Sequence, residues 1–115
     1  EGELLLIRSS YRKAHSLPGG YVKRGEDARL AATRELREET SLDVVPSRLK
    51  HAWHGARPFE NRRDELDIFE LEVDVRPVVP VNNREIVWAG WRSAAQVREM
   101  NVVPHLREYL DASGR

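Results

Sequence analysis

The chain has 115 residues, 40% hydrophobic and 33% charged, and its 19 basic residues balance 19 acidic ones. This length supports one domain with one hydrophobic core. The neutral balance argues against extended nucleic acid and anionic membranes as partners, because both require a concentrated basic field. The sequence has no cysteine and no apolar run of membrane-spanning length. It therefore excludes disulfides and thiolate metal sites, and cytoplasm is the expected location, with no membrane partner.

The first part of the chain predicts a strand, a loop and a helix. Residues 4–7 form an unbroken apolar run, which is typical of a strand buried on both faces. Residues 9–16 are polar, and the following Leu17-Pro18-Gly19-Gly20 forces irregular backbone. Residues 27–40 predict a helix, since they are rich in Ala, Leu, Arg and Glu and contain no internal Gly or Pro.

The second part predicts more strands and two further helices. Residues 49–53 predict a strand, and the near-alternation over 66–75 predicts a long one, bulged at the slip of Ile68–Phe69. After a proline-containing loop, residues 86–91 predict another strand. The helices are expected over 93–100 and from Pro104 through Leu110, with Gly114 just beyond. The sum is an α/β (α+β) domain with a helix on each side of a sheet.

Three acids of the first predicted helix carry the chemical signal. Glu35, Glu38 and Glu39 are spaced i, i+3, i+4 and fall on one helix face. Carboxylates that close repel one another, and a hard divalent cation would relieve the repulsion. The alternative is a solvated face with Arg34 and Arg37 as ion-pair partners. For the bare R-E-x-x-E-E segment, that alternative is the commoner one.

The spacing around these acids favours the first interpretation. The stretch 20–42 resembles the Nudix box, whose pattern is G-x5-E-x7-R-E-U-x-E-E-x-G-U with U an aliphatic residue. The only departure is Ser41 in place of the final Gly. A Gly just past a helix often adopts the left-handed conformation, which Ser takes less readily. Ser41 therefore implies about 1 kcal/mol of strain or a changed turn, and a slightly altered loop is expected. The matching residues are Gly20, Glu26, Arg34, Glu35, Leu36, Glu38, Glu39 and Leu42.

The resemblance extends beyond the box and implies a fold. Leu17 to Gly20 is similar to the family's entry to the box, Leu4 to Arg8 to the preceding strand, and Glu85-Ile86 with Trp91 to a downstream strand. Residues 1–115 are therefore expected to form a single Nudix hydrolase domain. Its expected architecture is an α/β/α sandwich with a mixed sheet, with the family's first strand upstream of Glu1.

The resemblance also implies a metal site. Glu35, Glu38 and Glu39 would bind Mg²⁺ or Mn²⁺, and the backbone carbonyl of Gly19 would complete the coordination. A separate pair of metal-binding side chains, His51 and His54, is three residues apart in a predicted strand and loop. That spacing does not align them, so a surface or partly buried pair is expected instead.

Catalytic roles follow from the same resemblance. Arg34 would orient the cluster by pairing with Glu26 and Glu35, and Glu38 or Glu39 would activate a water for attack on phosphorus. Glu85 is expected either as an added ligand or general base, or as an ordinary surface acid.

Substrate contacts are expected from basic side chains near the box. Lys23 and Arg24 lie within the glycine-shaped loop, and Arg8 lies on the preceding strand, where each could meet phosphate or remain a solvated charge. Pro58, which lies past the box, is a feature associated with ADP-ribose-cleaving members of the family.

Two functions remain open. The first is a metal-dependent pyrophosphohydrolase that cleaves a nucleoside diphosphate linked to another moiety. The candidates are a nucleoside triphosphate, ADP-ribose or a nucleotide sugar, and a dinucleoside polyphosphate. The alternative is a catalytically silent module that binds or senses a nucleotide. The expected partner is a small nucleotide-like molecule, and a homodimer is a further hypothesis.

Overall fold

The protein combines helices with antiparallel strands, as the α+β class predicts. The computed structural model describes residues 2–19, 22, 25–59, 62–81 and 85–115, and within the hairpin the side chains of 57–64 lie outside this description. The elements are β1 (Leu4–Ser9), α1 (Ala28–Thr40), the 3-10 helix η1 (Pro46–Arg48), β2 (Lys50–Phe59), β3 (Arg62–Glu70), β4 (Ile86–Arg92), α2 (Ala94–Arg98) and α3 (Pro104–Ala112).

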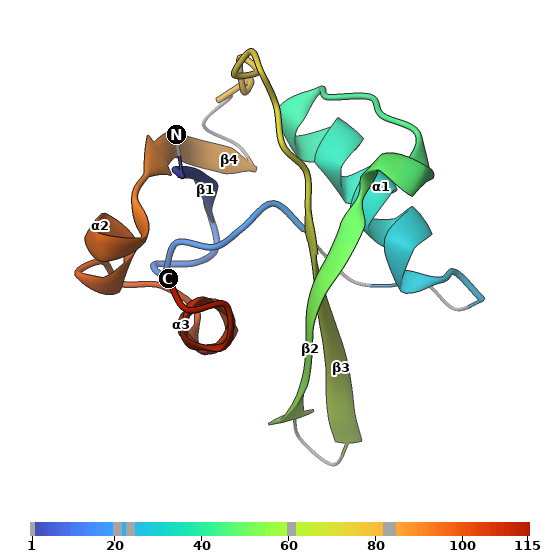
Figure 1. Cartoon of the computed structure of the whole chain (residues 1–115), viewed down its shortest axis with the longest axis vertical. Coiled ribbons are helices and arrows are strands. Elements are labelled where there is room, and N and C mark those ends of the chain that lie inside the picture. The colour runs from blue at the N-terminus through green and yellow to red at the C-terminus, as the bar shows by residue number, and fades with distance from the viewer. Residues whose placement is uncertain (1, 20–21, 23–24, 60–61, 82–84) are drawn as a thin grey trace.

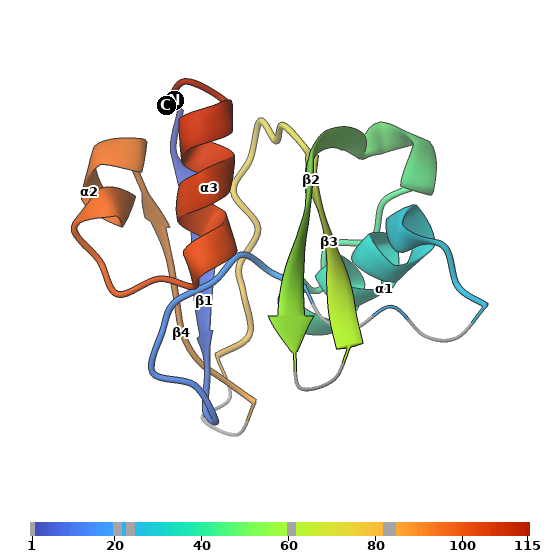
Figure 2. The same cartoon turned by 90° about the horizontal axis from the view of Figure 1, so that it is seen from below.

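The strands form two antiparallel ladders, β1–β4 and β2–β3. The β2–β3 hairpin stands between α1 on one side and α3 on the other, which gives the expected α/β/α layering (Figures 1 and 2). The single mixed sheet that was expected is not formed by the described residues. Their one parallel pairing is an isolated bridge between His15 and Val102. No helix formed by the described residues is long and apolar enough to cross a membrane.

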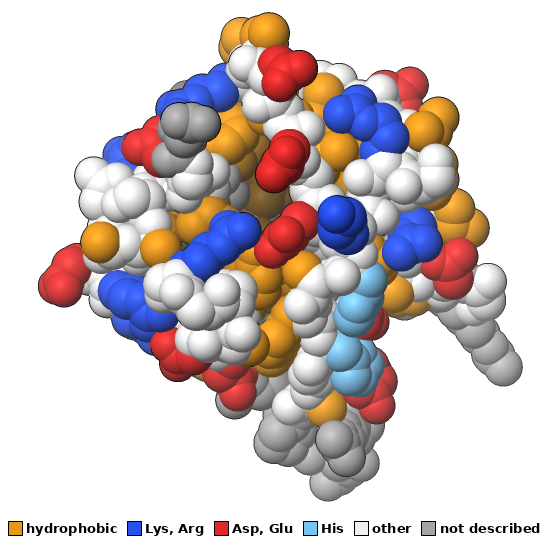
Figure 3. Space-filling model, viewed as in Figure 1, with side chains coloured by type: hydrophobic (Ala, Val, Ile, Leu, Met, Phe, Trp, Pro, Cys, Tyr) orange, Lys and Arg blue, Asp and Glu red, His pale blue; other side chains and the backbone are white. Residues whose placement is uncertain are grey.

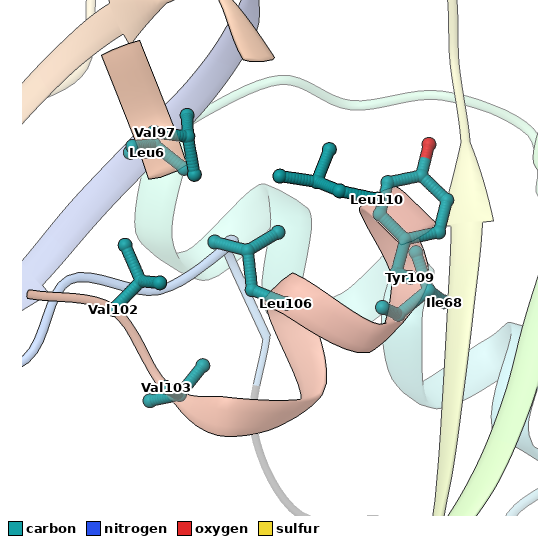
Figure 4. Close-up of a cluster of buried hydrophobic side chains, with 8 residues drawn as sticks. All are labelled: Leu6, Ile68, Val97, Val102, Val103, Leu106, Tyr109 and Leu110. Carbon is teal, nitrogen blue, oxygen red and sulfur yellow. The ribbon is translucent and has the colours of Figure 1, made fainter. Parts of the chain in front are cut away.

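One face of α3 forms the centre of the hydrophobic core (Figure 4). Leu106, Tyr109 and Leu110 recur at helical spacing and are at most 2% exposed. The side chains facing them come from β1, β3, α2 and the segment before α3. In β1, Leu6 and Ile7 are both buried although they point to opposite faces, which confirms the prediction for this strand. The cluster comprises Leu6, Ile68, Val97, Val102, Val103, Leu106, Tyr109 and Leu110.

The hairpin strands differ in extent from the sequence prediction. The strand predicted over 66–75 ends at Glu70, and the one predicted over 49–53 continues to Phe59. Residues 71–75 keep the apolar alternation but pair with no strand, and Val75 is 83% exposed. The outer half of the hairpin was missed because its residues are mostly polar or charged, and ladder hydrogen bonds do not require an apolar face.

A β-bulge lies in the hairpin where the sequence showed a slip. His51 pairs with Phe69 and Trp53 pairs with Ile68, so Ala52 is an extra residue in β2. The irregularity predicted at Ile68–Phe69 therefore falls in the opposite strand. Because one residue is inserted, side-chain alternation in β2 reverses at this point.

Helix α1 is fixed at both ends by specific hydrogen bonds. The Asp27 carboxylate accepts from the backbone N–H groups of Arg29 (2.7 Å) and Leu30 (3.1 Å), which caps the N-terminus. At the other end, Ser41 adopts φ 64° and ψ 8°, and its N–H donates to the Arg37 carbonyl. Of the two outcomes expected for Ser41, a strained left-handed residue or a changed turn, the structure shows the left-handed residue.

We expect Ser41→Gly to raise the free energy of unfolding by about 0.5–1 kcal/mol, because glycine adopts positive φ without the Cβ clash. Urea denaturation would measure it. Ser113→Gly is the matched control, since Ser113 ends α3 at φ −87° and has no such strain to relieve. Equal or lower stability of Ser41→Gly would contradict the expectation.

Candidate active site

Arg34 is the centre of a carboxylate network on α1. Its Nε and Nη2 donate to the two carboxylate oxygens of Glu26, each at 3.0 Å. Its Nη1 donates to Glu35 at 2.6 Å and lies 3.5 Å from both oxygens of Glu38. One guanidinium therefore joins three carboxylates, and the fork geometry toward Glu26 is one that only arginine provides.

The network is largely shielded from solvent. The side chains of Arg34, Glu26 and Glu35 are 16%, 17% and 16% exposed, whereas that of Glu38 is 49% exposed. Hydrogen bonds to Glu26 and then Glu35 raise the pKa of Arg34 above its ordinary value, against the opposing effect of burial. Arg34 thus stays charged, and its pairing fixes the orientation of Glu35. The partners predicted for Arg34 are those that the structure brings to it.

Glu39 links α1 to the loop that precedes it. The backbone N–H of Gly19 donates to Glu39 Oε1 at 2.7 Å. Burial, and then the charges of Glu35, Glu38 and Glu85, raise the pKa of Glu39 to about 7, although the Gly19 hydrogen bond opposes the shift. Glu39 is therefore a carboxyl group poised to exchange a proton near neutral pH.

Glu85 approaches the same cluster from outside α1. It immediately precedes β4, and its backbone carbonyl accepts a hydrogen bond from the N–H of Ser10 (2.9 Å), which ties it to the end of β1. Its charge acts on Glu39 together with those of Glu35 and Glu38. Glu85 thus belongs to the electrostatic environment of the cluster, although it lies 46 residues beyond Glu39 in the sequence.

Of the basic residues expected to bind substrate, only Arg8 can be placed relative to this cluster, and its hydrogen bond lies elsewhere. Lys23 and Arg24, like Gly20 of the box, lie outside the described residues. Arg8 lies in β1, where its guanidinium donates to the Arg12 carbonyl at 3.5 Å rather than to a carboxylate of the cluster.

A cavity of about 1390 Å³ opens beside the inner face of α1. It is lined by Ala31 and Leu36 of that face and by Trp91 of β4, whose ring lies under the Arg76 guanidinium at 4.8 Å. A hollow floored by hydrophobic side chains is seen in Figure 3. Trp91 lines this cavity, whereas Trp53 packs against the core.

The donor set of the cluster suits a hard divalent cation. Burial, and after it the charges of Glu35, Glu38 and Glu85, raise the pKa of Glu39. Among the described residues, a guanidinium contacts Glu35 and Glu38, whereas the hydrogen bond of Glu39 comes from the backbone of Gly19. Mg²⁺ and Mn²⁺ prefer such oxygen ligands, so these residues could hold one or more of these ions.

A second cluster contradicts one sequence prediction. His51 and His54 were expected to be misaligned, yet His51 Nε2 and His54 Nδ1 lie 2.8 and 2.9 Å from the same oxygen, Oδ1 of Asp67. The bulge at Ala52 is the reason, because it brings two residues three apart onto one strand face. The prediction that both histidines are at the surface is confirmed.

A family model and a known protein both match this sequence. A family model described as the NUDIX domain matches residues 1–112. The Bacillus subtilis (strain 168) protein named "Putative ADP-ribose pyrophosphatase YjhB" is 33% identical over 66 residues, which are 51% of this chain and 31% of that protein. The matched segment thus spans about a third of the length of that relative.

Solved structures share the fold over nearly the whole chain. The solution structure of the E. coli ORF135 protein superposes with a TM-score of 0.78 and 21% identity, over 97% of this chain and 79% of that one. A C. elegans Ap4A hydrolase binary complex gives a TM-score of 0.78 at 19% identity, over 97% and 83% of the two chains. At these identities the likeness concerns the fold alone.

Proposed function

The chain belongs to the NUDIX domain family, and from that premise we propose that it is a metal-dependent pyrophosphohydrolase acting on a nucleoside diphosphate linked to another moiety. The observation that carries the proposal is the acidic cluster of α1, in which Arg34 and Gly19 hold different carboxylates in place. Arg34 orients Glu26, Glu35 and Glu38, and Glu39 is anchored by Gly19 with a pKa near neutrality. A solvated acidic face would require none of this.

We assign the metal site to Glu35, Glu38 and Glu39, with the Gly19 carbonyl as a further ligand. When bound there, Mg²⁺ or Mn²⁺ would polarise the phosphoryl oxygens and neutralise charge on the leaving phosphate. Repulsion among the acids would then be relieved, which is the energetic reason for placing them together.

The chain's own groups would position and deprotonate the water. Glu39 or Glu38 would accept the proton as the water attacks phosphorus, and the neutral-range pKa of Glu39 favours it for this role. Glu85, whose charge acts on Glu39, is the second candidate for proton acceptor or added ligand. Arg34 and Glu26 would act indirectly, by holding Glu35 in place.

For the substrate we propose ADP-ribose or a nucleotide sugar before the other candidates. The relative named for ADP-ribose pyrophosphatase activity and the presence of Pro58 both favour this class. The cavity beside α1, with Trp91 at its wall, offers an aromatic surface on which a nucleobase could stack. A cytoplasmic location and a homodimer remain proposals, the latter open to a mass measurement in solution.

The test is product release from a substrate panel with Mg²⁺, with Mn²⁺ and with chelator. The panel comprises nucleoside triphosphates, ADP-ribose, nucleotide sugars and dinucleoside polyphosphates. We expect metal-dependent cleavage with ADP-ribose or a nucleotide sugar as the best substrate. Cleavage of another class would overturn the substrate assignment alone. If the folded protein cleaves nothing but binds a nucleotide, the silent binding module replaces the enzyme.

Metal affinity is expected to depend on pH through Glu39. Its pKa is raised from 4.5 to about 7, so below pH 7 a metal ion must displace a proton. We expect the affinity for Mn²⁺ to rise roughly fivefold between pH 6 and 7 and to level off above about pH 8. Titration calorimetry across this range would measure it. Glu39→Gln should flatten the profile, and an unchanged slope in that variant would assign the proton elsewhere.

A further inference from the structure

We propose that His51, His54 and Asp67 form a second metal site on the β2–β3 hairpin, specific for a borderline transition-metal ion such as Zn²⁺ and separate from the acidic cluster of α1. Their ligand atoms all lie within 4.8 Å of one another. Figure 3 shows histidine side chains on the surface over this hairpin with acidic side chains beside them. This site does not depend on the proposed hydrolase activity.

The backbone of the hairpin aligns the three side chains. His54 and Asp67 are direct cross-strand partners, and His51 pairs with Phe69, two residues further along β3. In a strand without a bulge, positions 51 and 54 would point to opposite faces, because they are three residues apart. The bulge therefore creates the constellation, and the ladder on either side of it holds the ligands in place.

The metal-free geometry leaves a position that a cation can occupy. Two ring nitrogens converge on Asp67 Oδ1 at 2.8 and 2.9 Å. Ligands around tetrahedral Zn²⁺ lie about 2.0–2.2 Å from the ion and hence roughly 3.4 Å apart. The His51 and His54 side chains are 42% and 53% exposed, so they can separate by the few tenths of an ångström needed.

Each ring nitrogen of His54 faces a carboxylate. Nδ1 lies 2.9 Å from Asp67 Oδ1, and Nε2 lies 3.0 Å from Glu65 Oε2. An ion bound at Nδ1 would leave Nε2–H to donate to Glu65.

The hydrogen bond from His54 Nε2–H to Glu65 is of the kind that orients histidine ligands in metal sites. Histidines that bind metal commonly donate their second ring N–H to a carboxylate, which fixes the tautomer and the ring orientation. Glu65 supplies this carboxylate for His54. For His51, the ring of Phe69 packs edge-on at 5.2 Å and limits its rotation. Both imidazoles are thus oriented before any ion binds.

The donor chemistry separates this site from the one on α1. Two imidazoles and one carboxylate suit Zn²⁺ and similar ions, whereas the all-oxygen set of α1 suits Mg²⁺ or Mn²⁺. Three protein ligands leave a coordination position open for water or for a further donor. Because β2 and β3 both contribute, a bound ion would also cross-link the hairpin.

The experiment titrates Zn²⁺ at pH 7.5 into the Glu38→Gln/Glu39→Gln protein, so that the acidic cluster contributes little. We expect one ion per chain by calorimetry, and a rise in Tm on adding Zn²⁺. His54→Ala and His51→Ala should each weaken binding at least about 100-fold and abolish the rise in Tm. Glu65→Gln should weaken binding only about tenfold, as expected for an outer partner.

His105→Ala is the matched control, since this histidine lies in α3 outside the cluster, and its binding should equal that of the background protein. Circular dichroism with chelator would establish that each variant folds, and Asp67→Asn gives an isosteric alternative if an alanine variant does not. Absence of Zn²⁺ binding by the background protein overturns the proposal. So does binding that persists unchanged in His51→Ala and His54→Ala.

Discussion

Glu39→Gln is expected to lower kcat by about a thousandfold while the fold survives. The glutamine side chain has the same shape, and its Oε1 can still accept the Gly19 N–H that now bonds Glu39 at 2.7 Å. What is lost is one negative charge and one proton acceptor in the cluster proposed to hold the metal and activate water. Steady-state hydrolysis of the best substrate at saturating Mg²⁺ would measure the effect.

The stability of Glu39→Gln is expected to change in the opposite direction from its kcat. Because the pKa of Glu39 is raised to about 7 in the folded protein, the folded state holds a proton that the unfolded chain releases near pH 4.5. The free energy of unfolding of the metal-free protein should therefore fall as pH rises between these values. Glu39→Gln should remove that loss, about 1–2 kcal/mol at pH 8 after allowance for solvent screening.

Two readouts moving in opposite directions distinguish a catalytic role from a structural one. If Glu39 had a purely structural role, the Glu39→Gln variant would lose activity and stability together. Glu99→Gln, at the exposed C-terminal end of α2, is the matched control and should change neither. Turnover of Glu39→Gln at the wild-type rate would remove Glu39 from the proposed machinery.

Arg34→Met is expected to reduce kcat and the affinity for Mn²⁺ by roughly 100-fold. Its guanidinium bonds Glu26 through two nitrogens and Glu35 through a third, so its loss leaves shielded carboxylates facing each other. Mutation of a residue that orients a metal ligand typically lowers metal affinity or activity 10–100-fold. Activity assays and Mn²⁺ titration would measure both quantities.

Two other arginine variants are the controls for Arg34→Met. Arg37→Met changes an exposed arginine one turn away, and we expect wild-type behaviour. Arg34→Lys keeps the charge but cannot reproduce the two-pronged contact with Glu26, so an intermediate loss of about tenfold is expected. Full activity in Arg34→Lys would mean that charge alone, and not orientation, is what Arg34 supplies.

The sequence predicted those parts of the molecule that depend on local pattern. Helix α1 follows from residue types at fixed spacings, and the structure begins and ends it within one residue of the predicted range. The Arg34–Glu26 pair was expected from the family resemblance, and the structure places the two in contact. Within one helix and its flanks, spacing alone limits which side chains can meet.

Features set by the pairing of distant segments could not be predicted in the same way. The approach of Glu85 to Glu39 depends on how β4 lies beside β1, which no local pattern encodes. The convergence of His51 and His54 depends on which strand absorbs the bulge, and the sequence showed its slip in the other strand. The strand over 71–75 was wrongly predicted because alternation does not reveal whether a partner strand is present.

The bulge at Ala52 also bears on how such a site could arise or vanish during evolution. Deleting this one small residue would leave His51 and His54 two positions apart in a regular strand, which still places both side chains on the face of Asp67. The same constellation can therefore come from a bulged strand with histidines three apart or from a regular strand with histidines two apart. Relatives with histidines three apart would share the chemistry only if their β2 also carries the bulge, because without it the two side chains point to opposite faces.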